Sequence, residues 1–247
     1  MKLNYKIQGD NQPILLIHGL FGSLDNLNML AKDLSNNYQT IQIDLRNHGQ
    51  SPWSNVMNYQ VMAEDVAELC HDLQLKNIVL IGHSMGGKVA LQLSQLIPVS
   101  KICAIDIAPV KYNETMNIPV IKALAQCINQ KLIDKKQIVD VMQEHGLTTP
   151  TILFLLKSFK HGHWLFNADV IINQYDHICD WHTISPCDIA TLFIRGGNSN
   201  YINDKDYPAI FSQFPNTQIE VIEGASHNVH AERTQQVLQL LYTWLIN

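Results

Sequence analysis

The sequence predicts an α/β fold, in which a mostly parallel central sheet carries helices on both faces and an inserted helical cap. Over the first hundred residues, short apolar runs alternate with amphipathic stretches, as in strands separated by helices. The apolar runs contain many β-branched residues and no polar alternation, which is typical of parallel strands covered on both faces. This alternation of strand and helix patterns stops after Pro109 and resumes near residue 190, so a segment without strands is expected to interrupt the sheet.

Each expected strand is a short apolar run, and each expected helix carries apolar residues at helical spacing. Ser23 is placed to cap the first helix, and Pro98 follows the third. The strands are expected over residues 13–19, 40–46, 77–83, 101–109, 190–197 and 218–224, and the helices over residues 23–37, 58–75, 85–97, 206–214 and 233–247.

The interrupting segment, residues 110–187, contains only helical patterns, with Pro119 and Pro150 as breaks between them. Because the sheet needs the strands that follow the segment, we expect an excursion from one domain rather than a second independent unit. The predicted organisation is an α/β core formed by residues 1–109 and 188–247, with residues 110–187 as the helical cap.

Composition excludes several classes of partner. The formal net charge is −5 and lysine and arginine form no run, which disfavours a nucleic-acid or anionic-membrane surface. No segment reaches transmembrane length, and the first ten residues lack the apolar stretch of a signal peptide. The five cysteines are odd in number and scattered, as in a reduced protein, so a cytoplasmic protein without stable membrane insertion is expected. The oligomeric state is left open.

The stretch "GHSMG", residues 82–86, fits the pattern G-x-S-x-G between an expected strand and an expected helix. A serine nucleophile there needs a tight turn, and glycines at positions 82 and 86 remove side chains that would crowd it. The following helix directs its N-terminal amides toward an oxyanion formed at Ser84. Ser84 is therefore the candidate nucleophile.

Two further segments supply the other expected parts of a serine hydrolase site. The stretch "HGLFGS", residues 18–23, follows the first strong strand, and we assign the oxyanion hole to the backbone N–H groups of Met85 and Leu20, with Phe21 as the alternative to Leu20. Taken alone, this stretch would be an ordinary turn. His227 follows the last expected strand and suits a general base on a loop. His230 is expected to pack locally, since no third ligand accompanies the pair at zinc spacing.

These segments resemble the α/β-hydrolase superfamily, in the order and spacing of its motifs over essentially the whole length. More narrowly, they are similar to the YbfF-type bacterial esterases. The resemblance implies an α/β-hydrolase fold and a cofactor-free cytosolic hydrolase of carboxylic esters, acyl-CoA thioesters included, with a helical cap over the site. The stretches that carry it are "HGLFGSLDNL", "DLRNHGQSP", "GHSMGGKVA", "IDIAPV", "RGGNSNY" and "GASHNVHAE".

The resemblance leaves the acid of the triad to be assigned. Many members of the superfamily place it after the next-to-last strand, but residues 195–206 offer carboxylates only late, at Asp204 and Asp206, where helix capping competes. Asp106 lies instead at an apolar strand end, where an unpaired carboxylate would be costly and an imidazole N–H would satisfy it. We therefore assign the triad acid to Asp106, with Asp204 as the main alternative and Asp169 among the others.

The remaining candidates concern substrate binding. Trp164 and Phe166 in the cap, together with Phe21, are expected to form an aromatic wall for an apolar acyl chain, although a simple role in the core of the cap is equally open for the cap aromatics. Arg46 and His48 are expected to brace neighbouring loops rather than to line the site. The alternative functions are a C–C hydrolase or an acyltransferase with the same triad, and a hydrolase-fold protein that binds a ligand without turnover.

Overall fold

A computed structural model describes residues 1–246, and its central feature is a seven-stranded sheet in the order β1-β3-β2-β4-β5-β8-β9. Strand β1 pairs antiparallel with β3, and the other neighbouring strands pair parallel. The mostly parallel sheet is thus confirmed, and β1 is added to it. The strands are β1 (Tyr5–Gln8), β2 (Pro13–Ile17), β3 (Gln39–Ile43), β4 (Val79–His83), β5 (Lys101–Ile105), β8 (Ala190–Gly196) and β9 (Thr217–Ile222).

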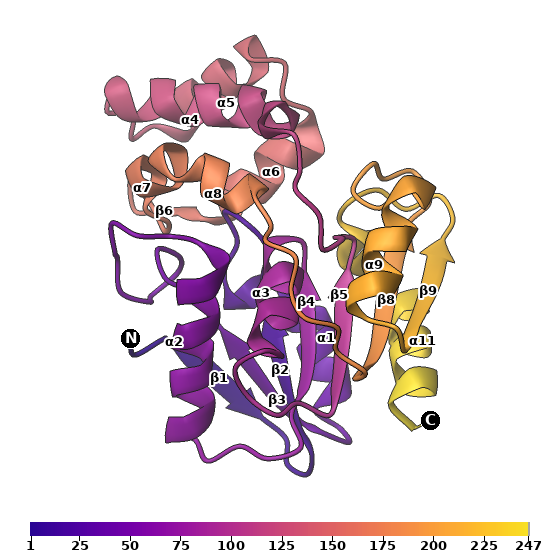
Figure 1. Ribbon diagram of the computed structural model, residues 1–247. Coiled ribbons are helices and arrows are strands. Elements are labelled where there is room, and N and C mark those ends of the chain that lie inside the picture. Colours follow the sequence, from indigo (N-terminus) through magenta and orange to yellow (C-terminus); the bar gives the residue numbers. More distant parts are fainter. Residues whose placement is uncertain (247) are drawn as a thin grey trace.

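Helices cover both faces of this sheet, and each face has its own core (Figure 1). Alternate residues of β2 show the division, because Leu15 and Ile17 join the core beneath α2 and α3, whereas Ile14 and Leu16 join the core beneath α1 and α11. The helices of this part are η1 (Leu24–Leu27), α1 (Asn28–Leu34), α2 (Tyr59–Asp72), α3 (Met85–Leu93), η3 (Asp204–Asp206), α9 (Tyr207–Gln213), α10 (Val229–Glu232) and α11 (Thr234–Ile246).

Between β5 and β8 the chain forms an insertion that lies beyond the carboxyl ends of the strands (Figure 1). Its elements are mainly helical, as expected, but the prediction of helices alone was wrong, because a short hairpin, β6–β7, follows α6. Two-residue strands are too short to give a periodic signal. The elements are η2 (Glu114–Asn117), α4 (Ile118–Asn129), α5 (Lys135–Glu144), α6 (Thr149–Lys157), β6 (Phe159–Lys160), β7 (His163–Trp164), α7 (Ala168–Asn173) and α8 (Tyr175–Cys179).

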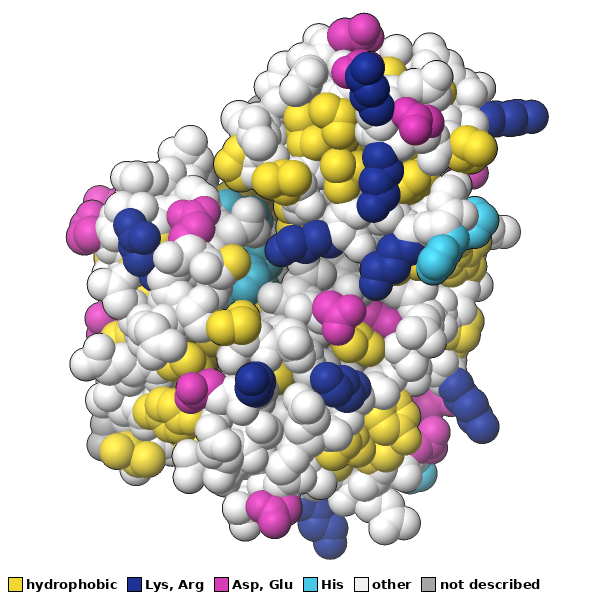
Figure 2. Space-filling model, turned by 180° about the vertical axis from the view of Figure 1, so that it is seen from behind, with side chains coloured by type: hydrophobic (Ala, Val, Ile, Leu, Met, Phe, Trp, Pro, Cys, Tyr) yellow, Lys and Arg dark blue, Asp and Glu magenta, His cyan; other side chains and the backbone are white. Residues whose placement is uncertain are grey.

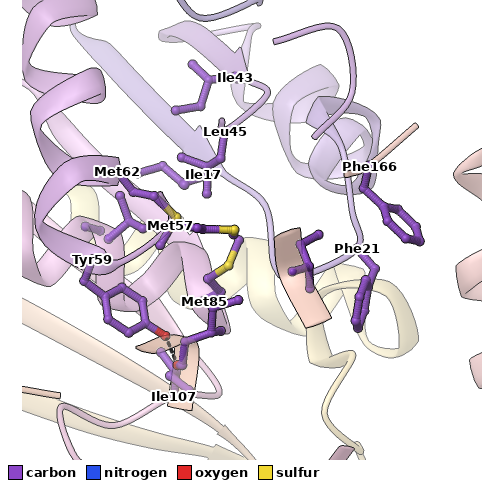
Figure 3. Close-up of a cluster of buried hydrophobic side chains, with 14 of the residues drawn as sticks. Ile17, Phe21, Ile43, Leu45, Met57, Tyr59, Met62, Met85, Ile107 and Phe166 are labelled. Atoms are coloured by element: carbon purple, nitrogen blue, oxygen red, sulfur yellow. Dashed lines mark hydrogen bonds between the residues drawn. The ribbon is translucent and has the colours of Figure 1, made fainter. Parts of the chain in front are cut away.

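Specific contacts hold this insertion on the sheet. The hydroxyl of Ser158 donates to the carbonyl of Phe21 at 2.8 Å, and the backbone N–H of Asn167 donates to the carbonyl of Asn47 at 2.8 Å. Figure 3 shows Phe21 and Phe166 facing each other at this boundary, with ring centroids 5.1 Å apart. The insertion is therefore packed directly against the loops that follow β2 and β3.

A buried lysine ties both ends of the insertion to α3. Lys88 has no exposed surface, and its ammonium lies over the rings of Tyr59, Tyr112 and Trp181, 4.7–5.7 Å from their centroids. It also donates to the backbone carbonyls of residues 179 and 180, at 3.5 and 3.1 Å. Burial lowers the pKa of Lys88 to about 7, although the charge of the nearby residue 180 opposes this.

Candidate active site

The turn after β4 holds Ser84 in a strained backbone conformation, with φ at 52° and ψ at −123°. The two flanking glycines are needed, because a Cβ at Gly82 would lie 2.2 Å from the carbonyl oxygen of Gly86. A Cβ at Gly86 would lie 2.3 Å from the carbonyl oxygen of Ile17. Met85 packs into the core below this turn (Figure 3), which fixes its own backbone N–H at the start of α3. The structure therefore has the sharp strand-to-helix turn that the sequence pattern predicts.

His227 and Asp106 meet Ser84 from two other loops. His227 Nε2 lies 2.9 Å from Ser84 Oγ, and His227 Nδ1 lies 2.7 Å from Asp106 Oδ2. Asp106 is completely buried, and its Oδ1 accepts the backbone N–H of Gly196 at 2.9 Å, while the hydroxyl of Ser199 donates to its Oδ2. These donors compensate the burial of the carboxylate. The three residues form one chain of hydrogen bonds, which can pass a proton from the serine hydroxyl to the imidazole.

The alternative acids lie elsewhere. The side chain of Asp204 is 87% exposed and pairs with Arg195 at 2.8 Å. Asp206 Oδ2 accepts the backbone N–H of Asn203, which is the capping role that the sequence suggested. Asp169 is exposed on α7, at the first turn of that helix. The structure therefore brings Asp106, rather than these carboxylates, to His227.

The candidate oxyanion donors belong to residues that line one cavity together with Ser84. Leu20, Phe21 and Met85 all line it. The N–H of Phe21 is already engaged, because it donates to His48 Nε2 at 3.2 Å. Within residues 1–246, the N–H groups of Leu20 and Met85 have no hydrogen-bond acceptor. The geometry thus favours Leu20 over its alternative, Phe21.

Two buried histidines hold the loop after β2 in place, and both stay neutral. His48 Nδ1 lies 3.0 Å from the carbonyl of Arg46 while its Nε2 accepts the Phe21 N–H, so the ring has no free nitrogen for a second proton. His18 is held in the same way, between the carbonyl of Gly19 at 2.7 Å and the N–H of Leu45 at 3.1 Å. Burial lowers the pKa of His18 to about 4 and that of His48 to about 3. His48 therefore braces the loop, as expected.

Arg46 has the same bracing role and does not line the cavity. Its Nε and Nη2 donate to the two carboxylate oxygens of Asp65, at 2.6 and 2.9 Å. A further nitrogen, Nη1, donates to the carbonyl of Val56 at 2.9 Å. This buried pair fastens the loop after β3 to α2.

His83 and His230 lie behind the candidate base. The ring of His83 contacts those of His227 and His230, with centroids 4.8 and 4.3 Å away, and its Nε2 lies 2.9 Å from the carbonyl of His227. Burial places the pKa of His83 well below its ordinary value. Within the described part of the chain, no group of three or more His, Cys, Asp or Glu side chains is arranged to hold a metal ion.

The cavity above Ser84 has a volume of about 540 Å³ and lies between the core and the insertion. Phe21 lines it as predicted, but Trp164 and Phe166 do not. They stack on each other with centroids 5.1 Å apart, and Phe166 packs behind Phe21. The cap aromatics thus belong to the core of the insertion, which is the second interpretation that the sequence left open. The apolar lining comes instead from Leu20, Met85, Ile107, Val120, Phe154, Leu155 and Ile178.

Two residues at this cavity were missed by the sequence analysis. Tyr201 stacks on the imidazole of His227, with ring centroids 3.7 Å apart and the planes 14° from parallel. Asn117 donates to the hydroxyls of Tyr175 and Tyr201, at 2.9 and 3.4 Å. Tyr201 lies in an irregular loop and Asn117 at the start of a helix in the insertion, so no periodicity marks either residue. Only the fold brings them to the site.

The parallel sheet and the sharp turn that carries Ser84 are features of the alpha/beta hydrolase fold, and comparisons with known proteins agree with this class. A family model described as alpha/beta hydrolase fold matches residues 12–126. The chain belongs to the alpha/beta hydrolase family. Separately, no helix within residues 1–246 has the length and apolar character that crossing a membrane requires.

Within this family, the chain is similar to proteins described as esterases and lipases. The chain is 42% identical to "Esterase YbfF" of Escherichia coli (strain K12), over 99% of both sequences. It is 32% identical to "sn-1-specific diacylglycerol lipase ABHD11" of Xenopus laevis, over 93% of this chain and 78% of that protein. Among solved structures, one described as "Marine microorganism esterase" superposes with a TM-score of 0.92 at 32% identity, covering 98% of this chain and 99% of the other.

Proposed function

We propose that the protein is a serine hydrolase of carboxylic esters that works through a covalent acyl-enzyme. The observation that carries the proposal is the continuous chain from Asp106 through His227 to Ser84, with separations of 2.7 and 2.9 Å. A serine hydroxyl is a weak nucleophile, and this arrangement supplies both the base that activates it and the carboxylate that orients the base.

In the first half of the proposed reaction, the Ser84 Oγ attacks the ester carbonyl carbon while His227 Nε2 takes the hydroxyl proton. The resulting tetrahedral oxyanion is stabilised by the N–H groups of Leu20 and Met85. His227 then returns its proton to the leaving alkoxide, which departs as an alcohol and leaves an acyl group on Ser84. Asp106 keeps the Nδ1 proton in place and stabilises the imidazolium.

In the second half, a water molecule attacks the acyl group. His227 now takes a proton from the water, and a second tetrahedral oxyanion forms in the same hole. When the bond between Ser84 Oγ and the acyl carbon breaks, His227 returns this proton to Oγ, which releases the carboxylic acid and restores the Ser84 hydroxyl. The nucleophile therefore returns to its starting state, and no oxidant or reductant takes part.

We infer that residues 110–187 act as the cap of this site, over the core formed by residues 1–109 and 188–247. Val120 and Phe154 line the cavity from α4 and α6, so helices of the insertion shape the space next to Ser84. Their apolar side chains suit the acyl part of a substrate. Acyl-CoA thioesters would react by the same steps, with a thiol as the leaving group.

Two other functions remain as alternatives. A C–C hydrolase or an acyltransferase would use the same triad with another substrate or acceptor, and a non-catalytic binding protein would keep the fold without turnover. The hydrogen-bonded Ser84 argues against the binding protein, because a serine with no reaction to perform does not need an aligned base.

A fluorophosphonate probe followed by mass spectrometry of the intact protein tests this proposal. We expect one adduct on the wild-type protein and none on Ser84→Ala. Ser226→Ala is the matched control, because Ser226 lines the same cavity yet is held by Glu232. An unlabelled wild-type protein, or labelling of Ser84→Ala, would contradict the proposal. A panel of chromogenic esters and acyl-CoA thioesters then identifies the substrate class.

A further inference from the structure

A second hollow, of about 530 Å³, lies between the core and the insertion and shares no lining residue with the cavity above Ser84. Its core side comes from η1, α1 and α10, and its insertion side from the start of α5, the end of α6 and β6. Figure 2 shows basic side chains gathered on this side of the molecule, beside a depression in which histidine is visible. The hollow is lined by Ser23, Asp25, Asn26, Leu27, Met29, Leu30, Lys135, Leu156, Lys157, Phe159, Lys160, His230 and Ala231.

The charge of this hollow is positive. Three lysines, Lys135, Lys157 and Lys160, line it from the insertion, and Asp25 is its one acidic lining residue. All three lysines are exposed, and within residues 1–246 none of them has an ion-pair partner. In a chain whose net charge is −5, three unpaired lysines around one hollow form a local attraction for anions.

His230 lines the same hollow, and one of its ring nitrogens has no hydrogen-bond partner in the described part of the chain. His230 is only 5% exposed, and its Nδ1 is buried with no hydrogen-bond partner among the described residues. Such a group normally finds a partner, because leaving a buried polar atom without a hydrogen bond is energetically costly. The pKa of His230 is lowered to about 3, chiefly by burial and then by the nearby charges of His227 and Lys157. Lys157 and His230 both line this hollow.

We propose that this hollow is an anion-binding site for a phosphate-bearing ligand, held by Lys135, Lys157 and Lys160 over His230. Lysine ammonium groups bind phosphate as point charges, and three of them suit more than one phosphate group. The volume of the hollow also exceeds what a single small anion fills. The neutral His230 ring donates one further hydrogen bond at the floor, and the side chain of Ser23 offers a hydroxyl at the edge.

The position of the site relates it to the proposed reaction without depending on it. His230 contacts His83, which in turn contacts the candidate base His227, so the hollow lies behind the triad rather than in front of it. The phosphate group can arrive as part of the leaving group of a phosphorylated thioester or as a separate anion. Binding is measured without turnover, so the site can be tested even if the proposed hydrolysis fails.

Inorganic pyrophosphate is the probe, titrated into the whole protein by calorimetry at low ionic strength. We expect saturable binding that weakens roughly tenfold or more in the double variant Lys157→Gln and Lys160→Gln, since two of the three ammonium groups that would bind the anion are removed. Lys136→Gln is the matched control, because that lysine is an exposed neighbour on α5 outside the lining set. Equal affinity in the double variant, or no binding by the wild-type protein, would overturn the proposal.

A second readout reports on the floor of the hollow. Pyrophosphate should shift the imidazole resonance of His230 and raise its pKa, because a neighbouring anion favours the protonated ring. The resonance is assigned by its loss in His230→Gln. If the ring signal stays unchanged at saturation, the anion binds elsewhere and the assignment of this hollow is wrong.

Kinetics then separates the two sources of the phosphate. If it belongs to the substrate, the double variant should raise KM for acetyl-CoA and leave the hydrolysis of 4-nitrophenyl acetate unchanged. If it is a separate anion, both reactions keep their KM values while pyrophosphate binding is still lost. Both results support the site, because each requires the loss of binding in the lysine variant.

Discussion

His227 Nδ1 lies 2.7 Å from Asp106 Oδ2, although the two residues are 121 positions apart in the chain. This contact places the carboxylate partner of the imidazole after β5 rather than after β8. The loop after β8 still takes part, because the N–H of Gly196 and the hydroxyl of Ser199 both donate to Asp106. The loop after β8 thus has no carboxylate in its early positions, but it donates hydrogen bonds to Asp106 in the loop after β5.

The first prediction compares two carboxylates. Asp106→Asn should lower kcat by roughly 10²–10⁴ with the fold preserved, because the imidazole loses the partner that fixes its tautomer. Asp204→Asn should lower kcat by less than about threefold, since Asp204 is an exposed partner of Arg195. Steady-state kinetics on a chromogenic ester, with circular dichroism to check folding, measures both. The opposite ranking would move the acid to the later loop.

Much of this site is predictable from the sequence, for a physical reason. Parallel strands covered on both faces give continuous apolar runs, and their carboxyl ends meet at one edge, so Ser84, Asp106 and His227, which all follow expected strands, are expected at the same edge. The glycines around Ser84 add a local steric signal. The edge strand β1 gives no such signal, because most of its residues are exposed.

The parts that the sequence did not predict depend on long-range packing. The sequence could not decide whether Trp164 and Phe166 contact the substrate or the cap core, and the structure packs Phe166 against Phe21 and stacks Trp164 on Phe166. Lys88 follows the nucleophile motif as an ordinary helical residue, and only the fold surrounds it with the rings of α2 and of both ends of the insertion. Neither arrangement has a periodic or spacing signature along the chain.

The second prediction concerns acyl-chain preference. Phe154→Ala enlarges the cavity on its α6 side, so it should shift the preference toward longer acyl esters by lowering their KM relative to the acetate. Phe166→Ala should instead destabilise the protein by about 3–5 kcal/mol and leave the ratio of KM values unchanged, since Phe166 is fully packed and outside the cavity. If Phe166→Ala changes that ratio, Phe166 contributes to substrate binding after all, and its assignment to the core of the insertion is wrong.

The third prediction uses the pKa of His48, which burial lowers to about 3 from an ordinary value of 6.5. Between these values the ring is protonated in the unfolded chain but neutral in the native protein. The free energy of unfolding therefore falls as the pH drops from 6.5 toward 3. His48→Gln should reduce that slope by up to about 1.4 kcal/mol per pH unit. Urea unfolding of the wild-type protein and of His48→Gln at pH 5 and pH 6.5 measures this change. If the free energy of unfolding changes equally with pH in the two proteins, His48 is not held neutral.

The fourth prediction uses Lys88, whose pKa is lowered to about 7 from 10.5. Between these values the unfolded chain holds a proton that the native lysine has lost, so the native state gains stability as the pH rises. Relative to Lys88→Met, the wild-type protein should therefore gain up to about 1.4 kcal/mol per pH unit between pH 7 and pH 9. A difference between the two proteins that does not change with pH would mean that Lys88 stays charged in its aromatic surroundings.

The most direct measurement is the turnover of a chromogenic acetate ester by Ser84→Ala. The central claim is that Ser84, aligned by His227 at 2.9 Å, forms the acyl-enzyme. The account predicts that kcat falls by on the order of 10⁶, the scale seen when a triad nucleophile is removed, while Ser226→Ala stays within a few-fold of the wild-type protein. If folded Ser84→Ala keeps more than about a tenth of the wild-type activity, another group is the nucleophile and the proposed mechanism is wrong.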